Sequence, residues 1–191
     1  FILLMPFLFS QNTSLAQYQI GQDLYGDNAQ DRFGNEVSIS GDGKVMAIGS
    51  SNYCKIYKKS NCAWVEDIEI NVGLESVRLA LSNDGSRIVI GIPSKGAPSM
   101  GSAGAVYVFE NINNDWELVG SPIIGEINNA NFGSVVSISG DGKIIACDYS
   151  YLKEKDGRTE IYELINNNWV QIGGDIVGEN TEDAAIITSK S

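Results

Sequence analysis

Three tryptophans set the plan of this chain. Trp64, Trp116 and Trp169 are separated by 52 and 53 residues. A glycine stands nine residues after each tryptophan, and an aromatic residue stands seven residues before it. The glycines are Gly73, Gly125 and Gly178, and the aromatic residues are Tyr57, Phe109 and Tyr162. Three markers kept in one frame through three copies indicate a tandem structural repeat of about 50 residues.

An Asp-Gly pair forms a second marker. The motif SISGDGK runs from Ser38 to Lys44 and recurs from Ser137 to Lys143, with the variant ALSNDGS from Ala80 to Ser86. The aspartates Asp42, Asp84 and Asp141 are spaced by 42 and 57 residues, so insertions and deletions separate them. Such length variation belongs in loops between fixed strands.

A partial copy precedes the three units. QIGQDLYG, from Gln19 to Gly26, parallels QIGGDIVG, from Gln171 to Gly178. The repeat therefore starts late in one unit, passes through three, and begins a fourth. We expect both ends to be truncated relative to a longer parent. Closure as a small propeller and assembly of copies into a ring are the alternatives, since an open stack would leave an apolar face that favours self-association.

The sequence predicts four short strands in each unit. In the first unit we expect strands at Glu36–Ser40, Val45–Ile48, Lys55–Lys59 and Trp64–Ile70. Alternation of Val37 and Ile39 marks a half-buried strand, and the continuous apolar second strand predicts burial on both faces. Asp42-Gly43 predicts a tight hairpin turn, because Asp and Gly tolerate positive φ. The turns before the second and third tryptophans are rich in Asn, which suits turns for the same reason.

No stretch has a helical period, and β-branched and aromatic residues fill the apolar positions. Four antiparallel strands in each repeat are the blade pattern of a β-propeller, because a two-sided sheet needs a neighbour on each face. We therefore predict an all-β fold of tandem four-stranded antiparallel blades of a β-propeller, three blades plus partial flanking units. The tryptophans and aromatic markers are expected to pack between blades.

The motifs resemble a known repeat type. Phe33-Gly34 and Phe132-Gly133 precede the first strands, Gly91-Ile92-Pro93 closes the second strand of the middle unit, and Gly104 to Phe109 follow its loop. Together these segments resemble FG-GAP repeats of integrin α-subunit propellers, and especially the FG-GAP-like repeats of secreted bacterial surface proteins. The resemblance covers about Gln19 to Gly178 and implies a propeller without specifying a function.

The chain departs from that family in four places. The middle unit has Glu75-Ser76 in place of Phe-Gly, and the last unit has Asp148-Tyr149-Ser150 in place of Gly-x-Pro. After Gly178, Ala185-Ile186 stands where Phe-Gly is expected. The Asp-Gly turns are also too short for the six to eight oxygens that calcium needs, so no calcium site is predicted. Five acidic residues in other loops could bind a cation only weakly and are expected to be solvated charges: Asp27, Asp31, Glu179, Glu182 and Asp183.

Composition excludes several functions. The net charge is −11, which argues against partners such as nucleic acid or an anionic membrane surface. The chain has no histidine, so the commonest general base and metal ligand is missing, and we predict no metal site and no cofactor. Cys54, Cys62 and Cys147 are an odd count. Cys54 and Cys62 are close enough in sequence to pair, but Cys62 falls in a turn, so unpaired cysteines are expected.

The N-terminus FILLMPFLFSQNTSLAQ has an apolar run, too short to span a bilayer, and then Ser14-Leu15-Ala16. This pattern is typical of a secretory signal peptide that lacks its first residues, although an apolar edge strand would look similar. We expect residues 1–16 to be that incomplete signal and residues 17–191 to form the FG-GAP-like repeat domain. The mature protein is then expected to be secreted or at the cell surface, without membrane insertion.

Three functions remain open. The first is a non-catalytic extracellular module for protein or carbohydrate binding or adhesion, with the loop Ser94–Gly104 as its candidate contact, although its small residues also suit a flexible connector. The second is a structural spacer repeat in a larger secreted protein. The third, a polysaccharide-active enzyme, needs a carboxylate pair that breaks the repeat; Asp148 and Asp156 break it but have no evident partner. We therefore predict no catalytic residues, no enzyme activity and no assignable ligand-binding residue.

Overall fold

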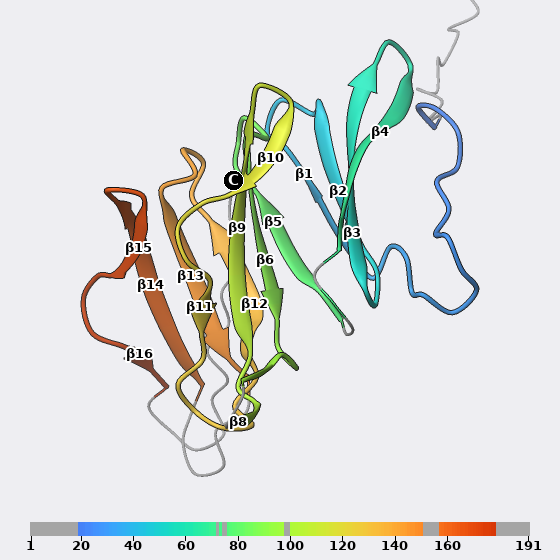
Figure 1. Ribbon diagram of the computed structural model, residues 1–191. Coiled ribbons are helices and arrows are strands. Elements are labelled where there is room, and N and C mark those ends of the chain that lie inside the picture. Colours follow the sequence, from blue (N-terminus) through green and yellow to red (C-terminus); the bar gives the residue numbers. More distant parts are fainter. Residues whose placement is uncertain (1–18, 72, 74–75, 98–99, 151–156, 179–191) are drawn as a thin grey trace, which may run out of the picture.

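The fold consists of strands, turns and loops (Figure 1). The computed structural model describes residues 19–71, 73, 76–97, 100–150 and 157–178. The expected signal peptide, Glu179, Glu182, Asp183 and Asp156 lie outside these residues. Within them, no helix is long and apolar enough to cross a membrane.

The strands form three antiparallel sheets. Sheet 1 contains β1 (Glu36–Ile39), β2 (Val45–Gly49), β3 (Tyr53–Ser60) and β4 (Ala63–Asn71). Sheet 2 contains β5 (Arg78–Leu81), β6 (Arg87–Ile92), β9 (Ala105–Ile112), β10 (Asp115–Leu118) and β11 (Ile123–Ile124). Sheet 3 contains β12 (Phe132–Ile138), β13 (Ile144–Tyr149), β14 (Arg158–Ile165), β15 (Asn168–Gln171) and β16 (Ile176–Val177). A separate hairpin joins β7 (Gly96–Ala97) to β8 (Met100–Ser102).

The prediction of an all-β fold built from antiparallel four-stranded units is confirmed. In the first unit all four expected strands are present, with ends displaced by no more than two residues. The fifth strand of sheets 2 and 3 is the continuation of the fourth. Both β10 and β11 pair with β9, and both β15 and β16 pair with β14. Gly120 and Gly173, with φ of 69° and 72°, interrupt the strand between each pair, because this backbone region favours glycine.

Each Asp-Gly turn has the same geometry. The Gly43 N–H donates to the Ser40 carbonyl at 2.9 Å, and Gly43 alone in this turn has positive φ, at 68°. The expected tight turn is therefore present, but Asp42 does not adopt positive φ in it. Its contribution is the side chain, which accepts hydrogen bonds from the Ser40 hydroxyl and the Lys44 N–H. This arrangement is a type I turn followed by a left-handed glycine.

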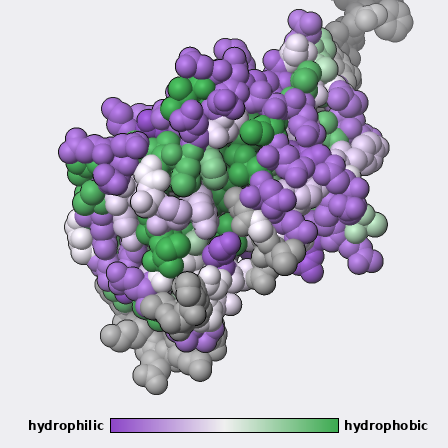
Figure 2. All heavy atoms as spheres, in the orientation of Figure 1, coloured by the Kyte–Doolittle hydropathy of each residue, from purple (hydrophilic) through white to green (hydrophobic). Residues whose placement is uncertain are grey.

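The sheets stack face to face. One core lies between sheets 1 and 2, where Ala47 and Ile56 pack in the same cluster as Leu79 and Ile90. A second core lies between sheets 2 and 3 and is built around Val89, Val108, Val136, Ile145 and Tyr149. The first strand of the middle sheet, β5, contacts the first strands of both neighbours, β1 and β12. Figure 2 shows apolar residues over the middle of the stack, with hydrophilic residues around them.

A chain of backbone hydrogen bonds links the Asp-Gly turns of the three sheets. The Gly41 N–H donates to the Asn83 carbonyl at 2.8 Å, and the Asn83 N–H donates to the Gly140 carbonyl at 3.0 Å. These three residues hold the same place in the repeat, directly before each Asp. The bonds satisfy polar groups at the junctions and fix the register of one sheet against the next.

Trp116 and Trp169 pack against the cores between sheets, whereas Trp64 lies beside the segment Gln19–Tyr25. The turns before Trp169 and Trp64 lie against the outer segment of the preceding unit. A β-carbon added to Gly120 would lie 3.0 Å from the Asn167 carbonyl, just before Trp169, and one added to Gly21 would lie 3.4 Å from the Cys62 carbonyl, just before Trp64. The segment Gln19–Gly26 thus supplies for sheet 1 what the preceding sheet supplies elsewhere.

Candidate functional site

The carboxylates of the Asp-Gly turns are held in hydrogen bonds within the turn. Asp42 accepts from the Ser40 hydroxyl at 2.7 Å, and that bond, together with the contacts to Lys44, lowers the pKa of Asp42 to about 2. Asp84 and Asp141 accept the same bonds from the serine two residues before and the residue two after. Among the described residues, no group of three or more Cys, Asp and Glu is placed to hold a metal ion.

Asp148 is the one carboxylate among the described residues that both breaks the repeat and is buried without full pairing. Its Oδ1 atom has no hydrogen-bond partner among the described residues, and burial raises the pKa of Asp148 to about 6. Its neighbour across the ladder is Thr159, whereas Glu160 lies opposite Cys147. Because successive side chains of a strand point to opposite faces, Asp148 and Glu160 face opposite sides of sheet 3. They therefore do not form a carboxylate pair.

Glu160 belongs to a buried polar cluster between sheets 2 and 3. It accepts a hydrogen bond of 2.6 Å from the Tyr162 hydroxyl and pairs with Arg158. The Arg158 guanidinium lies over the Tyr149 ring, 5.1 Å from its centroid, and forms a second ion pair of 3.0 Å with Asp175. Burial raises the pKa of Tyr149 to about 12 and raises that of Tyr162 further. Both phenols stay protonated at neutral pH, so the cluster is suited to holding structure.

A second polar cluster surrounds Lys55 on the opposite side of the stack. The Lys55 ammonium contacts Asp27 at 2.6 Å, Glu66 at 3.3 Å and Glu69 at 3.8 Å, and its side chain is almost fully buried. The Asp27 hydrogen bond is the main cause that raises the pKa of Lys55. The Tyr53 hydroxyl donates to Asp31 and accepts from the Asp27 N–H.

Asp27 and Asp31 are loop charges that keep contact with solvent, as expected, but each also has a partner in sheet 1. Asp27 pairs with the buried Lys55 ammonium, which needs an anionic partner, and Asp31 accepts from the Tyr53 hydroxyl. Sequence reasoning also missed Lys55, Tyr107 and Glu160, which hold one repeat position, two residues before the aromatic marker. The available signal was a pair of charged residues of opposite sign, Lys55 and Glu160, at one repeat position of the first and third units.

The cysteines lie apart. Cys54 is buried on β3, Cys62 is exposed in the turn at the far end of β3, and Cys147 is buried on β13. None of the three is joined in a disulfide. Burial raises the pKa of the Cys54 thiol to about 12, which keeps it protonated and unreactive.

The predicted contact loop Ser94–Gly104, of which residues 98 and 99 lie outside the described part of the chain, is attached to the linker that enters sheet 3. The Asn128 side chain accepts from the Gly101 N–H at 2.7 Å, and the Asn129 side chain accepts from the Ser102 N–H at 3.3 Å. Backbone bonds reinforce this contact, since the Asn131 N–H donates to the Ser102 carbonyl and the Phe132 N–H to the Ala103 carbonyl. Both asparagines are exposed beside the β7–β8 hairpin.

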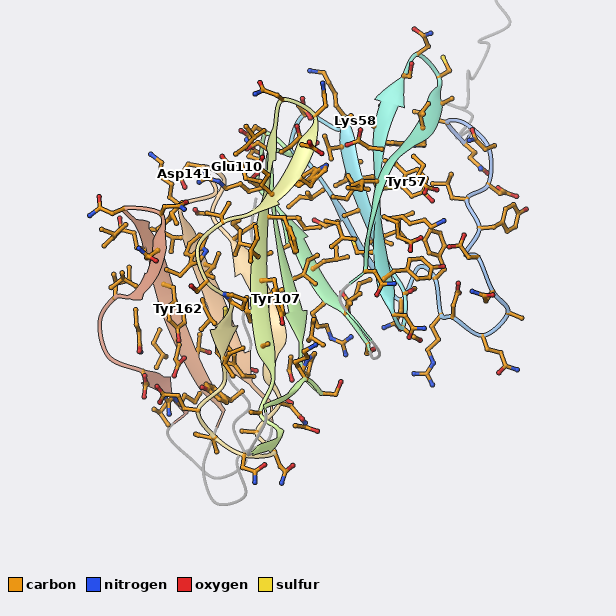
Figure 3. All side chains as sticks on the ribbon, in the orientation of Figure 1. Tyr57, Lys58, Tyr107, Glu110, Asp141 and Tyr162 are labelled. Atoms are coloured by element: carbon orange, nitrogen blue, oxygen red, sulfur yellow. The ribbon has the colours of Figure 1, made fainter. Side chains whose placement is uncertain are left out.

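This loop surface lies at the opposite end of the stack from the Asp-Gly turns (Figure 1). Figure 3 places Lys58, Glu110 and Asp141 together at the turn end, one from each sheet. Lys58 also donates to Asn114 of sheet 2, and Arg87 of sheet 2 bonds both Glu110 and the Gly142 carbonyl of sheet 3. Both ends thus carry contacts between sheets, and at the loop end the exposed Asn128 and Asn129 make such contacts.

Comparison with known proteins gives a likeness of fold. No family model and no curated protein matches the chain. Among solved structures, hydrazine synthase of Kuenenia stuttgartiensis is similar, with a TM-score of 0.51 and 14% identity over 74% of this chain. The matched region covers 36% of that chain, so this protein spans about a third of its length. At this identity the likeness concerns the fold alone.

Proposed function

We propose that this chain is a propeller-type, non-catalytic extracellular module that binds a protein or a carbohydrate through its loop end. The propeller arrangement is supported by sheets of one plan stacked face to face, with neighbouring first strands in contact. The FG-GAP-like motifs agree with this arrangement, and secretion rests on the leader-like N-terminus.

The observation that carries the proposal is the surface formed by the β7–β8 hairpin and the linker 126–131. Asn128 and Asn129 hold the two segments together and remain exposed. A rigid scaffold that presents fixed polar loops is the usual design of a binding surface. Asp148, the candidate for an enzyme, does not form a carboxylate pair with Glu160, since the two face opposite sides of sheet 3.

The test is a binding screen of the full chain against glycans and extracellular matrix proteins. The double variant N128A/N129A removes both side-chain acceptors and should weaken binding of any ligand found by about tenfold or more. N168A is the matched control, because Asn168 is also exposed but begins β15, next to the β14–β15 turn at the other end. Equal loss in both variants would contradict a loop-end site, and a negative screen would favour the structural spacer.

A further inference from the structure

Two loops with the same backbone conformation lead into the first strands of sheets 1 and 3. We call residues 27–34 loop 1 and residues 126–133, which include the linker 126–131, loop 3. Their sequences, DNAQDRFG and EINNANFG, share only the final Phe-Gly pair. Yet both have positive φ at the same three positions, which are Gln30, Arg32 and Gly34 in loop 1 and Asn129, Asn131 and Gly133 in loop 3. Because Gln and Arg rarely adopt this backbone region, contacts with the rest of the sheet must hold loop 1 in shape.

A single tyrosine holds loop 3 at both ends. The Tyr149 hydroxyl accepts a hydrogen bond of 3.3 Å from the N–H of Glu126, the first residue of the loop. The Tyr149 ring packs on the ring of Phe132, near the end of the loop, with 4.7 Å between the two ring centroids. Tyr149 and Phe132 are both buried. The start and the end of loop 3 are therefore tied to one side chain in the sheet.

Tyr53 makes the same set of contacts with loop 1. Its hydroxyl accepts a hydrogen bond of 3.0 Å from the N–H of Asp27, and its ring centroid lies 6.2 Å from that of Phe33. A cation also lies over each tyrosine ring. The Lys55 ammonium is 5.6 Å from the Tyr53 centroid, as the Arg158 guanidinium is 5.1 Å from the other. The two loops thus share one type of anchor as well as one conformation.

The two tyrosines come from different repeat positions. Tyr149 stands eight residues after the aspartate of its Asp-Gly turn, where sheet 2 has Ile92. Tyr53 stands four residues before the aromatic marker of its sheet, where sheet 2 has Ala105 and sheet 3 has Arg158. Tyr149 and Arg158 are opposite each other on the β13–β14 ladder, so the two positions are neighbours and either can place a hydroxyl beside the loop. Sheet 2, whose entering loop is shorter, has a tyrosine at neither position.

We propose that Tyr149 is a positioning residue for the binding surface at the loop end. It fixes loop 3 in the sheet, and loop 3 in turn fixes the β7–β8 hairpin through the side chains of Asn128 and Asn129. The hairpin and the loop therefore form one unit whose shape is set before a ligand arrives. Such a surface loses less conformational freedom on binding and holds its ligand more tightly. The proposal rests on the proposed function, because it concerns the same surface.

The first test is amide hydrogen exchange of the full chain, which needs no ligand. Y149F removes only the hydroxyl and keeps the ring that packs on Phe132. We expect exchange to become about three- to tenfold faster at the N–H groups of Glu126, Gly101 and Ser102, because the start of loop 3 loses its hydrogen bond and the hairpin follows the loop. The amides of β13 and β14 should keep their wild-type rates.

Y149L separates the hydroxyl from the ring. It removes both contacts, so exchange should also become faster at the Phe132 N–H, which donates to the Ala103 carbonyl. The conservative variant Y149F should restore the wild-type rate at Phe132 but not at Glu126. Circular dichroism establishes that each variant is folded, and the Y149F rates decide the test even where Y149L does not fold.

Two other tyrosines supply the controls. Y162F removes a buried hydroxyl that binds Glu160 and should leave the rate at Glu126 unchanged. Y53F should speed exchange at the Asp27 N–H and leave loop 3 unaffected, because Tyr53 holds loop 1. The proposal is overturned if Y149F leaves the Glu126 rate unchanged, if its effect is spread evenly over sheet 3, or if Y162F has the same effect.

The second test repeats the screen against glycans and extracellular matrix proteins with Y149F and Y53F. A glycan or matrix protein that binds the wild-type chain should bind Y149F about threefold or more weakly and Y53F as tightly as the wild type. Unchanged binding to Y149F, or equal weakening in both variants, would overturn the positioning role. A screen in which nothing binds the wild type refutes the proposed function, whereas the exchange rates alone decide whether Tyr149 holds loop 3.

Discussion

The indole N–H of Trp169 on β15 donates a hydrogen bond of 3.0 Å to the carbonyl oxygen of Val119, which follows β10 in the preceding sheet. Trp116 on β10 makes the corresponding bond, also 3.0 Å, to the carboxylate of Asp67 on β4. Val119 and Asp67 hold the same repeat position, three residues after the tryptophan of their own sheet. The repeat thus conserves the donor and its position, while the acceptor is a backbone group in one junction and a side chain in the other.

This difference in acceptor predicts unequal effects for one substitution. W169F removes the donor to a buried backbone carbonyl, so we expect a loss of about 1–2 kcal/mol in the free energy of unfolding. W116F removes the donor to the Asp67 carboxylate, which keeps an ion pair of 3.0 Å with Lys58, so the loss should be smaller by about 1 kcal/mol. Urea unfolding of both variants measures the two values. Equal losses would mean that ring size, common to both substitutions, determines the effect.

The sheets could be predicted from the sequence because each strand pattern occurs in three copies, so that an unclear pattern in one copy is resolved by the other two. Trp64, Trp116 and Trp169 align the three units, so the alternation of apolar residues in one strand can be compared with that in the two equivalent strands. Sequence reasoning could not find the breaks at Gly120 and Gly173, because a glycine in a strand does not reveal its φ. The backbone hydrogen bonds from Gly41 to Asn83 and from Asn83 to Gly140 also could not be predicted, because backbone contacts between sheets do not require particular residue types.

Two glycines with positive φ test the role of space around the backbone. G43A places a β-carbon at a φ of 68° with nothing within 4 Å, so only the conformational cost of about 1 kcal/mol is expected. G104A has a similar φ of 87°, but its β-carbon would lie 2.1 Å from the Phe132 carbonyl oxygen. We expect G104A to lose more than about 3 kcal/mol or to fail to fold. Thermal unfolding compares them, and equal stability of the two variants would contradict the close approach.

Lys55 should control attachment of the N-terminal loop. K55M removes the cation that Asp27, Glu66 and Glu69 share, and we expect a loss of about 1–2 kcal/mol, since the half-exposed carboxylates regain water. Cleavage between residues 19 and 31 in limited proteolysis should become faster, because Asp27 no longer holds this segment. K44M, which alters an exposed lysine, is the control. Slow cleavage in K55M would show that the Tyr53–Asp31 contact is sufficient.

The polar clusters were harder to predict than the fold. Lys55 and Glu160 stand at one repeat position on strands that also carry exposed charges, and only packing distinguishes an inward charge from an outward one. Their partners lie far away in sequence, as Asp27 does from Lys55. These ion pairs depend on the path that the loops take beside the sheet. The alternation of residues within a strand does not determine that path.

Asp148 should make the stability of the protein depend on pH. Its pKa in the folded protein is about 6, above the ordinary value of 3.8, because burial disfavours the charged form. The folded state therefore binds the proton more tightly than the unfolded state, and the associated stability is present below about pH 4 and is lost as pH rises through 6. D148N cannot ionise, so its stability relative to wild type should rise by about 2–3 kcal/mol between pH 4 and pH 7. Asp42 provides the opposite case, because its pKa is lowered to about 2, so D42N should be destabilised at pH 7 rather than stabilised. Urea unfolding of the three proteins across this pH range measures the effect, and a difference between D148N and wild type that stays constant with pH would refute the raised pKa.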